Sequence, residues 1–184
     1  MSIVSFRHRE APATAGLLLL VLAAALFGAS AVLASEPDAV VGQWRDDRSV
    51  LVVSRVGESL SMRIHAVLDP VYKAGEQPGP VGAPRRDSRN PDASLQHRPI
   101  LGLDLLIGYA WTGERWEGEI YDPESGKTYK SYMTVDDDGQ LAMRGYIGAP
   151  MFGRTAEFKP ANDCDEAVLK MLAASQIEGC TVGR

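Results

Sequence analysis

The sequence has few of the residues from which metal and redox centres are built, since its 184 residues include two cysteines and three histidines. It also lacks a basic excess: the net charge is −5, which argues against binding to nucleic acid. Long apolar runs are confined to one N-terminal stretch, which argues against a polytopic membrane protein, and an apolar share of 45% argues against a disordered chain. These absences indicate a soluble, mildly acidic globular domain.

No charged residue occurs between positions 11 and 35, and a basic stretch that includes Arg7 and Arg9 precedes this region. The region ends in Ala-Ser-Ala at 29–31 and Val-Leu-Ala at 32–34. Basic, apolar and small residues in this order are typical of a secretory signal peptide. We therefore predict a signal peptide over residues 1–34, cleavage after Ala34 and an exported protein, periplasmic or secreted. An uncleaved apolar anchor of about 20 residues is the alternative.

Both cysteines, Cys164 and Cys180, lie in the part that would be exported. An even number of cysteines in an oxidising compartment favours a disulfide, and closing this loop would stabilise the fold by roughly 3 kcal/mol. A zinc site lacks further ligands nearby, because only His65 and His97 remain after the predicted cut. The sequence therefore predicts one structural disulfide, no metal and no cofactor.

Short apolar-rich runs separated by turn residues fill the chain from Val40 onward, as in all-β domains. The third run shows the alternation clearly, with apolar side chains at 60, 62, 64 and 66 and polar ones at 61, 63 and 65. Eight antiparallel strands can close an up-and-down barrel, either filled by side chains or hollow. We predict such a barrel over residues 35–160, with strands at 40–45, 49–56, 59–68, 100–112 (bent or bulged at a glycine), 114–121, 127–135, 140–147 and 153–159.

Two segments depart from the strand pattern. Residues 69–98 contain five prolines, which cannot donate to a strand ladder, and loops of this length are usually functional or disordered. Residues 161–184 form a tail in which 163–175 has helical spacing, with Asn162 or Asp163 as its cap and Cys180 tying back its end. The three aspartates at 136–138 indicate a solvated turn rather than a calcium site.

Several short motifs resemble a bacterial family of exported proteins known as domain of unknown function 2147. They occur in order between Val41 and Lys159, whereas the cysteine-bearing tail looks like an addition. The resemblance implies no settled activity. The motifs are Gly42-Gln43-Trp44, Asp87-Ser88-Arg89-Asn90-Pro91-Asp92, Arg98-Pro99-Ile100-Leu101-Gly102-Leu103, Ile120-Tyr121-Asp122-Pro123, Gly126-Lys127-Thr128-Tyr129, Arg144-Gly145-Tyr146-Ile147-Gly148 and Gly153-Arg154-Thr155.

A weaker resemblance is to lipocalin-like barrels, whose first strand opens with a Gly-x-Trp like that of Gly42 and Trp44. In such barrels a basic side chain of the last strand often stacks on this tryptophan. The resemblance therefore implies a lipocalin-like barrel and pairs Trp44 with Arg154.

Catalytic constellations are scarce, because His65 and His97 have no partner in a recognisable motif. Aromatic side chains with polar tips cluster in the second half of the barrel and could line a cavity. Arg144 and Tyr146 share one strand face and Leu141 and Met143 the other, so Arg144 is either a surface or loop-docking residue or, if it faces the lumen, a partner for an anion.

The segment around Asp87 also has two interpretations. Its short polar side chains either fix the loop through local hydrogen bonds or form a polar rim over the barrel mouth. We take as candidate ligand-binding residues Trp44, Asp87, Asn90, Asp92, Arg98, Tyr109, Trp111, Trp116, Tyr129, Arg144 and Tyr146.

The leading hypothesis is a non-enzymatic protein that binds a small apolar or amphipathic molecule, or an envelope component, at the barrel mouth beneath the proline-rich loop. The alternative is a periplasmic interaction module that docks a protein through residues 69–98. An enzyme is the least favoured class. The sequence predicts no nucleic-acid partner and no membrane span after cleavage, and it leaves the oligomeric state open.

Overall fold

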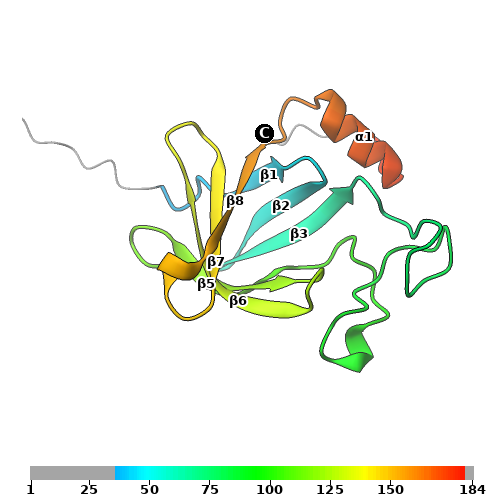
Figure 1. The fold of residues 1–184 in the computed structure, drawn as a ribbon. Coiled ribbons are helices and arrows are strands. Elements are labelled where there is room, and N and C mark those ends of the chain that lie inside the picture. The colour runs from blue at the N-terminus through cyan, green and yellow to red at the C-terminus, as the bar shows by residue number, and fades with distance from the viewer. Residues whose placement is uncertain (1–35, 181–184) are drawn as a thin grey trace, which may run out of the picture. The chain divides into compact units, whose positions relative to one another are not determined.

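The computed structural model describes residues 36–180, which fold into eight strands, one α-helix and two short 3₁₀ helices (Figure 1). Within this part of the chain no helix is long and apolar enough to cross a membrane. The elements are β1 (Gly42–Arg45), β2 (Ser49–Val56), β3 (Ser59–Val67), η1 (Ala93–Leu95), β4 (Leu106–Trp111), β5 (Trp116–Asp122), β6 (Lys127–Val135), β7 (Leu141–Tyr146), η2 (Pro150–Phe152), β8 (Arg154–Pro160) and α1 (Glu166–Ala174). Each of the eight predicted strand regions overlaps one observed strand.

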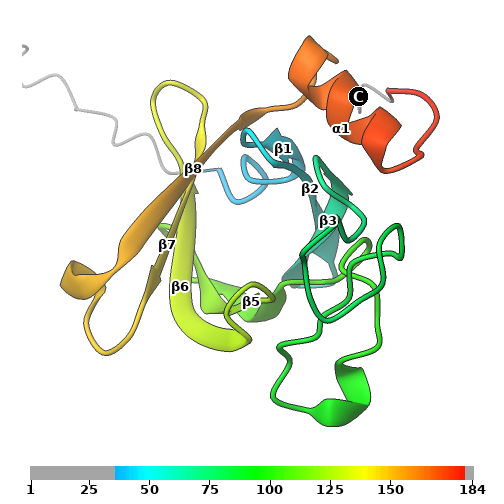
Figure 2. The same ribbon diagram turned by 45° about the vertical axis from the view of Figure 1, so that its right-hand side comes forward.

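The strands form one antiparallel sheet in the order β3-β2-β1-β8-β7-β6-β5-β4, curled into a nearly closed barrel (Figure 2). Every sequential pair is a hairpin neighbour except β3 and β4, which the long loop separates, and β8 returns to pair with β1. That last pairing is short, through Trp44 with Pro160 and Arg45 with Lys159. The remainder of β8 therefore has no strand neighbour on its β1 side within the described sheet.

The other edges, β3 and β4, meet through the chain just before β4. The amides of Ile64 and Leu105 donate to the carbonyls of Leu103 and Met62, and the Asp104 carboxylate accepts hydrogen bonds from the Ser61 hydroxyl and the Met62 amide. The prediction of one strand over 100–112 is wrong in its first half, because this segment turns and makes isolated contacts to β3. Its second half is confirmed: the register shifts between residues 107 and 110, at a glycine.

Side chains fill the barrel interior, as strand alternation requires. Trp44, Met62, Trp116 and Met133 are at most 5% exposed and belong to one apolar cluster. The turn before β1, residues 36–40, closes one end of the barrel. Val40 is buried there, and Trp116 Nε1 donates a hydrogen bond to the Pro37 carbonyl at 2.7 Å. The lumen is therefore packed at that end.

Helix α1 lies outside the barrel against β2 and β3, where it buries Val168, Met171 and Leu172 in a second apolar cluster with Val50 and Ala66. The register of β2 and β3 shifts by one residue next to Val50, which turns Ala66 from the interior to the outer face.

The helix begins one turn later than predicted. Its cap is Asp165, which accepts from the Val168 amide, rather than Asn162 or Asp163, because Cys164 adopts a positive φ of 48° and makes a turn first. The hydrogen bond from the Val168 amide holds the pKa of the Asp165 carboxyl group below its ordinary value, and the nearby Arg45 guanidinium lowers it further. The predicted disulfide between Cys164 and Cys180 is confirmed.

Reduction of this disulfide should lower the free energy of unfolding by about 3 kcal/mol, because the unfolded chain regains the freedom of the closed loop. The measurement is urea unfolding followed by tryptophan fluorescence, with and without reductant. The Cys164→Ser/Cys180→Ser variant is the control. Its unfolding midpoint should equal that of the reduced protein and should not change when reductant is added. An unchanged midpoint would show that α1 unfolds separately from the barrel.

Candidate functional site

The buried carboxylate of Asp87 organises the long loop between β3 and β4. Asp87 is 0% exposed, and its Oδ1 accepts from the Tyr121 hydroxyl at 2.6 Å. Its Oδ2 accepts from Asn90 Nδ2 at 2.7 Å and from Arg98 Nε and NH2 at 3.0 and 2.8 Å. A buried carboxylate needs such partners, so these four residues, which we call the Asp87 hub, fix the loop to β5.

Asp92 lies beside the hub and has a local role. Its amide donates to the Asn90 side-chain oxygen, and its carboxylate caps η1 by accepting from the Ser94 amide and hydroxyl. The two hydrogen bonds from Ser94 hold the pKa of the Asp92 carboxyl group below its ordinary value, and the one from the hydroxyl has the larger effect. Of the two interpretations of this segment, the one in which polar side chains fix the loop describes the observed contacts. It applies to each of the four candidates there, Asp87, Asn90, Asp92 and Arg98.

A depression of about 510 Å³ lies within the loop itself; we call it the loop pocket. The Asp87 hub holds two walls of this pocket together. One wall contains Arg86 and Ser88, which flank Asp87 in the sequence, and the other contains Gln96 and His97, which precede Arg98. The pocket is lined by Tyr72, Pro78, Gly79, Pro80, Ala83, Arg86, Ser88, Ala93, Gln96 and His97.

Tyr72 is the buried side chain of this pocket, at 4% exposure. Its hydroxyl accepts from the Arg86 amide at 3.2 Å, and the Arg85 guanidinium lies 5.4 Å from the ring centroid. Gly79 packs directly on the ring, since a Cβ there would come within 2.2 Å of it. The ring is therefore held in one orientation, which preserves the shape of the pocket.

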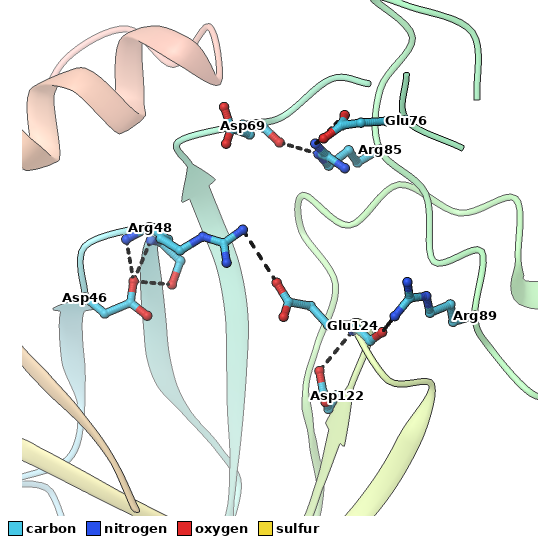
Figure 3. A network of polar contacts seen from close by, with 9 residues as sticks. Asp46, Arg48, Asp69, Glu76, Arg85, Arg89, Asp122 and Glu124 are labelled. Carbon is cyan, nitrogen blue, oxygen red and sulfur yellow. Dashed lines mark hydrogen bonds and ion pairs between the residues drawn. The ribbon is translucent and has the colours of Figure 1, made fainter. Parts of the chain in front are cut away.

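A second set of polar contacts links the loop to the turns at the end of the barrel (Figure 3). Arg89 donates to the Glu124 carbonyl, and the Glu124 carboxylate lies 3.8 Å from Arg48 on the β1–β2 turn. Within the loop, Arg85 binds Glu76 through two hydrogen bonds, which lower the pKa of that carboxyl group, and donates to the Asp69 carbonyl. Arg89 therefore joins the loop to the β5–β6 turn, whereas Arg85 holds the first part of the loop together.

Except for Tyr146, the aromatic candidates of the barrel lie on its inner face instead of in the loop pocket. The Tyr109 hydroxyl is hydrogen-bonded to Ser131 Oγ inside the lumen, and the rings of Trp111 and Trp116 lie 5.7 Å apart. Trp44 donates from Nε1 to the Val40 carbonyl at 2.8 Å. These side chains fill space that a hollow barrel would leave to a ligand.

The implied pairing of Trp44 with Arg154 is wrong. The strand register places Trp44 opposite Pro160, and six residues of extended chain, about 20 Å, separate that position from Arg154. Trp116 has a cation–π contact instead: the Arg55 guanidinium lies 4.9 Å from its ring centroid and also binds Asp38.

Arg144 and Tyr146 lie on the outer face of β7, while Leu141 and Met143 are buried. Arg144 donates to the Pro150 carbonyl at 2.7 Å and to Thr155 Oγ1 at 2.9 Å, so it supports the β7–β8 loop. Half-buried Tyr129 lies on the inner face of β6, near the β5–β6 turn. The candidates are thus divided between three places: the loop, the lumen and the outer surface.

A further depression of about 610 Å³ lies on the outer face of β2 and β3 and includes His65 and Arg63. Neither of the two depressions lies in the lumen. None of the candidate ligand-binding residues predicted from the sequence lines the loop pocket, because the loop has no periodicity. The available signal was the position of Arg86, Ser88 and His97 directly beside the Asp87 and Arg98 motifs.

Comparison with known proteins gives a family and a fold. The model of a family described as "Uncharacterized protein conserved in bacteria (DUF2147)" matches residues 42–159, and no curated protein matches the chain. A solved structure described as "Protein HP1028 from the human pathogen Helicobacter pylori belongs to the lipocalin family" is similar, with a TM-score of 0.53 and 18% identity over 72% of this chain and 97% of that one. The predicted lipocalin-like barrel is confirmed, and at this identity the likeness concerns the fold alone.

Replacing Asp87 by Asn should destabilise the protein by about 2–3 kcal/mol, because the amide leaves Arg98 without its charged partner and one donor unsatisfied. Urea unfolding measures the loss. The matched control is Glu124→Gln, which removes an exposed carboxylate from the same end of the barrel and should change stability little. Equal effects of the two variants would show that the hub does not hold the loop.

Stability should also fall as the pH rises from about 10 towards 12. Burial raises the pKa of Tyr109 to about 12, and burial together with the hydrogen bond to Asp87 raises that of Tyr121 to about 12. Because the folded state holds both protons more tightly than the unfolded chain, their contribution is complete below pH 10 and is lost above it. Urea unfolding at pH 9 and 11 should show this loss, and Tyr109→Phe and Tyr121→Phe should each reduce it.

Proposed function

Because this chain belongs to the bacterial family DUF2147, whose description states no activity, we propose its function from its own geometry. It binds a small amphipathic molecule with an acidic group, and it does so in the loop pocket. The observation that carries this proposal is a pocket of about 510 Å³ held in shape by a fully buried, fully hydrogen-bonded carboxylate. Small-molecule sites have this size and are pre-formed in the same way.

The lining of the pocket supports an amphipathic ligand. One part is apolar, formed by the Tyr72 ring, prolines and alanines, and the other presents Arg86, Ser88, Gln96 and His97. The Arg86 side chain forms no ion pair with any residue between 36 and 180, so a ligand carboxylate or phosphate would be its partner.

The filled interior supports the loop pocket over the lumen as the binding site. An apolar ligand in the lumen would have to displace Trp116, Tyr109 or Met133, all of which are fully buried. Our proposal therefore moves the site from the barrel mouth, where the sequence placed it, into the loop above.

We also propose that residues 1–34 direct export and are removed after Ala34. These residues lie outside the described part of the chain, and the support is their sequence pattern together with the disulfide, which is typical of proteins that fold in an oxidising compartment.

Decanoate is a suitable probe, because it joins a carboxylate to an apolar tail. Isothermal titration should show binding, and Arg86→Gln should weaken it about tenfold by removing a charge-assisted hydrogen bond. Decanol, which has no charge, should bind the wild type and Arg86→Gln equally.

The matched control is Arg63→Gln in the outer-face depression, which should leave decanoate affinity unchanged. If Arg63→Gln weakens binding and Arg86→Gln does not, the site lies on β2 and β3 instead. No heat of binding for either probe would refute the proposal.

A further inference from the structure

The β7–β8 hairpin carries an exposed apolar tip. Ile147, Met151 and Phe152 are 71%, 76% and 79% exposed, and all three belong to the short connection between the two strands. The hairpin projects away from β1, β2 and β3, with η2 at its end (Figure 2). Three large apolar side chains exposed together in one loop are unusual on a globular surface.

Specific contacts hold the tip in place. The Arg144 guanidinium binds the Pro150 carbonyl and Thr155 and thus joins the loop to both strands. Gly153 permits a close approach, since a Cβ there would lie 2.6 Å from the Gly145 carbonyl oxygen. The exposure of the apolar side chains is therefore imposed by the hairpin backbone.

The charge around the tip is opposite to that of the whole protein. Residues 139–156 contain Arg144 and Arg154 and no Asp or Glu, in a chain with 24 acidic residues and a net charge of −5. Arg154 is exposed and forms no ion pair within residues 36–180. Half-buried Tyr146 adds an aromatic ring with a polar end behind the tip.

We propose that this hairpin docks on the surface of an anionic lipid bilayer, with Ile147, Met151 and Phe152 inserted at the boundary between headgroups and acyl chains. An apolar tip above a basic, aromatic base is the arrangement that binds such interfaces. The tip presents roughly 400 Å², about half of what each partner buries in a specific protein–protein contact, and a bilayer requires no matching shape. The proposal does not depend on ligand binding in the loop pocket.

The test is co-sedimentation with vesicles of phosphatidylcholine alone or with 30% phosphatidylglycerol. The protein is recovered from a periplasmic extract, and every variant is compared in the same N-terminal background. The wild type should bind the anionic vesicles, and Ile147→Ser/Met151→Ser/Phe152→Ser should lower the partition coefficient about tenfold or more. The matched control, Val56→Ser/Val81→Ser/Leu169→Ser, removes three exposed apolar side chains elsewhere and should stay within about twofold.

The charge contribution is tested separately. Arg154→Gln should lower binding to anionic vesicles about fivefold, whereas Lys170→Gln on the exposed face of α1 should have no effect. Circular dichroism and urea unfolding verify that each variant folds.

Three results would overturn the proposal. These are no vesicle binding by the wild type, equal binding by the tip variant and the control, or a wild-type dimer in sedimentation equilibrium that the tip variant loses. The last would show that the tip contacts a second copy of the chain.

Discussion

The shape of the long loop depends on one buried carboxylate. Asp87 has no contact with water, and its three partners come from the loop and from β5. A charge placed there costs free energy unless every partner is in position, so the loop conformations that break the hub are disfavoured together. The loop pocket and the attachment of the loop to β5 follow from this constraint, although the loop has no regular secondary structure beyond η1.

Strand alternation was sufficient to predict the strands, because period two can be read directly from residues such as Leu60, Met62 and Ile64, and their number predicted a barrel. It did not predict which contacts join β3 to the chain before β4, since those of Asp104 with Ser61 and Met62 link residues more than forty positions apart. The motif around Asp87 was recognised from its short polar side chains, but its direct contact with Tyr121 was not. The loop pocket could not be predicted, because its lining depends on how an aperiodic segment folds back on Tyr72.

The packed interior separates fold from function in this protein. A barrel of eight strands can enclose a ligand, yet here Trp44, Trp116 and Met133 occupy that space. Both candidate surfaces lie outside the barrel interior instead: one in the long loop that connects the edge strands β3 and β4, the other at the tip of the β7–β8 hairpin. The barrel acts as the rigid support on which both are mounted.

The turn at 36–40 has a practical consequence for shortened forms of the protein. The family match begins at residue 42, but Val40 is part of the core and Pro37 satisfies the indole of Trp116. A chain trimmed to the matched region would leave a fully buried Trp116 with an unpaired donor and one barrel end open to water. The smallest independent folding unit is therefore larger than the segment by which the family is recognised.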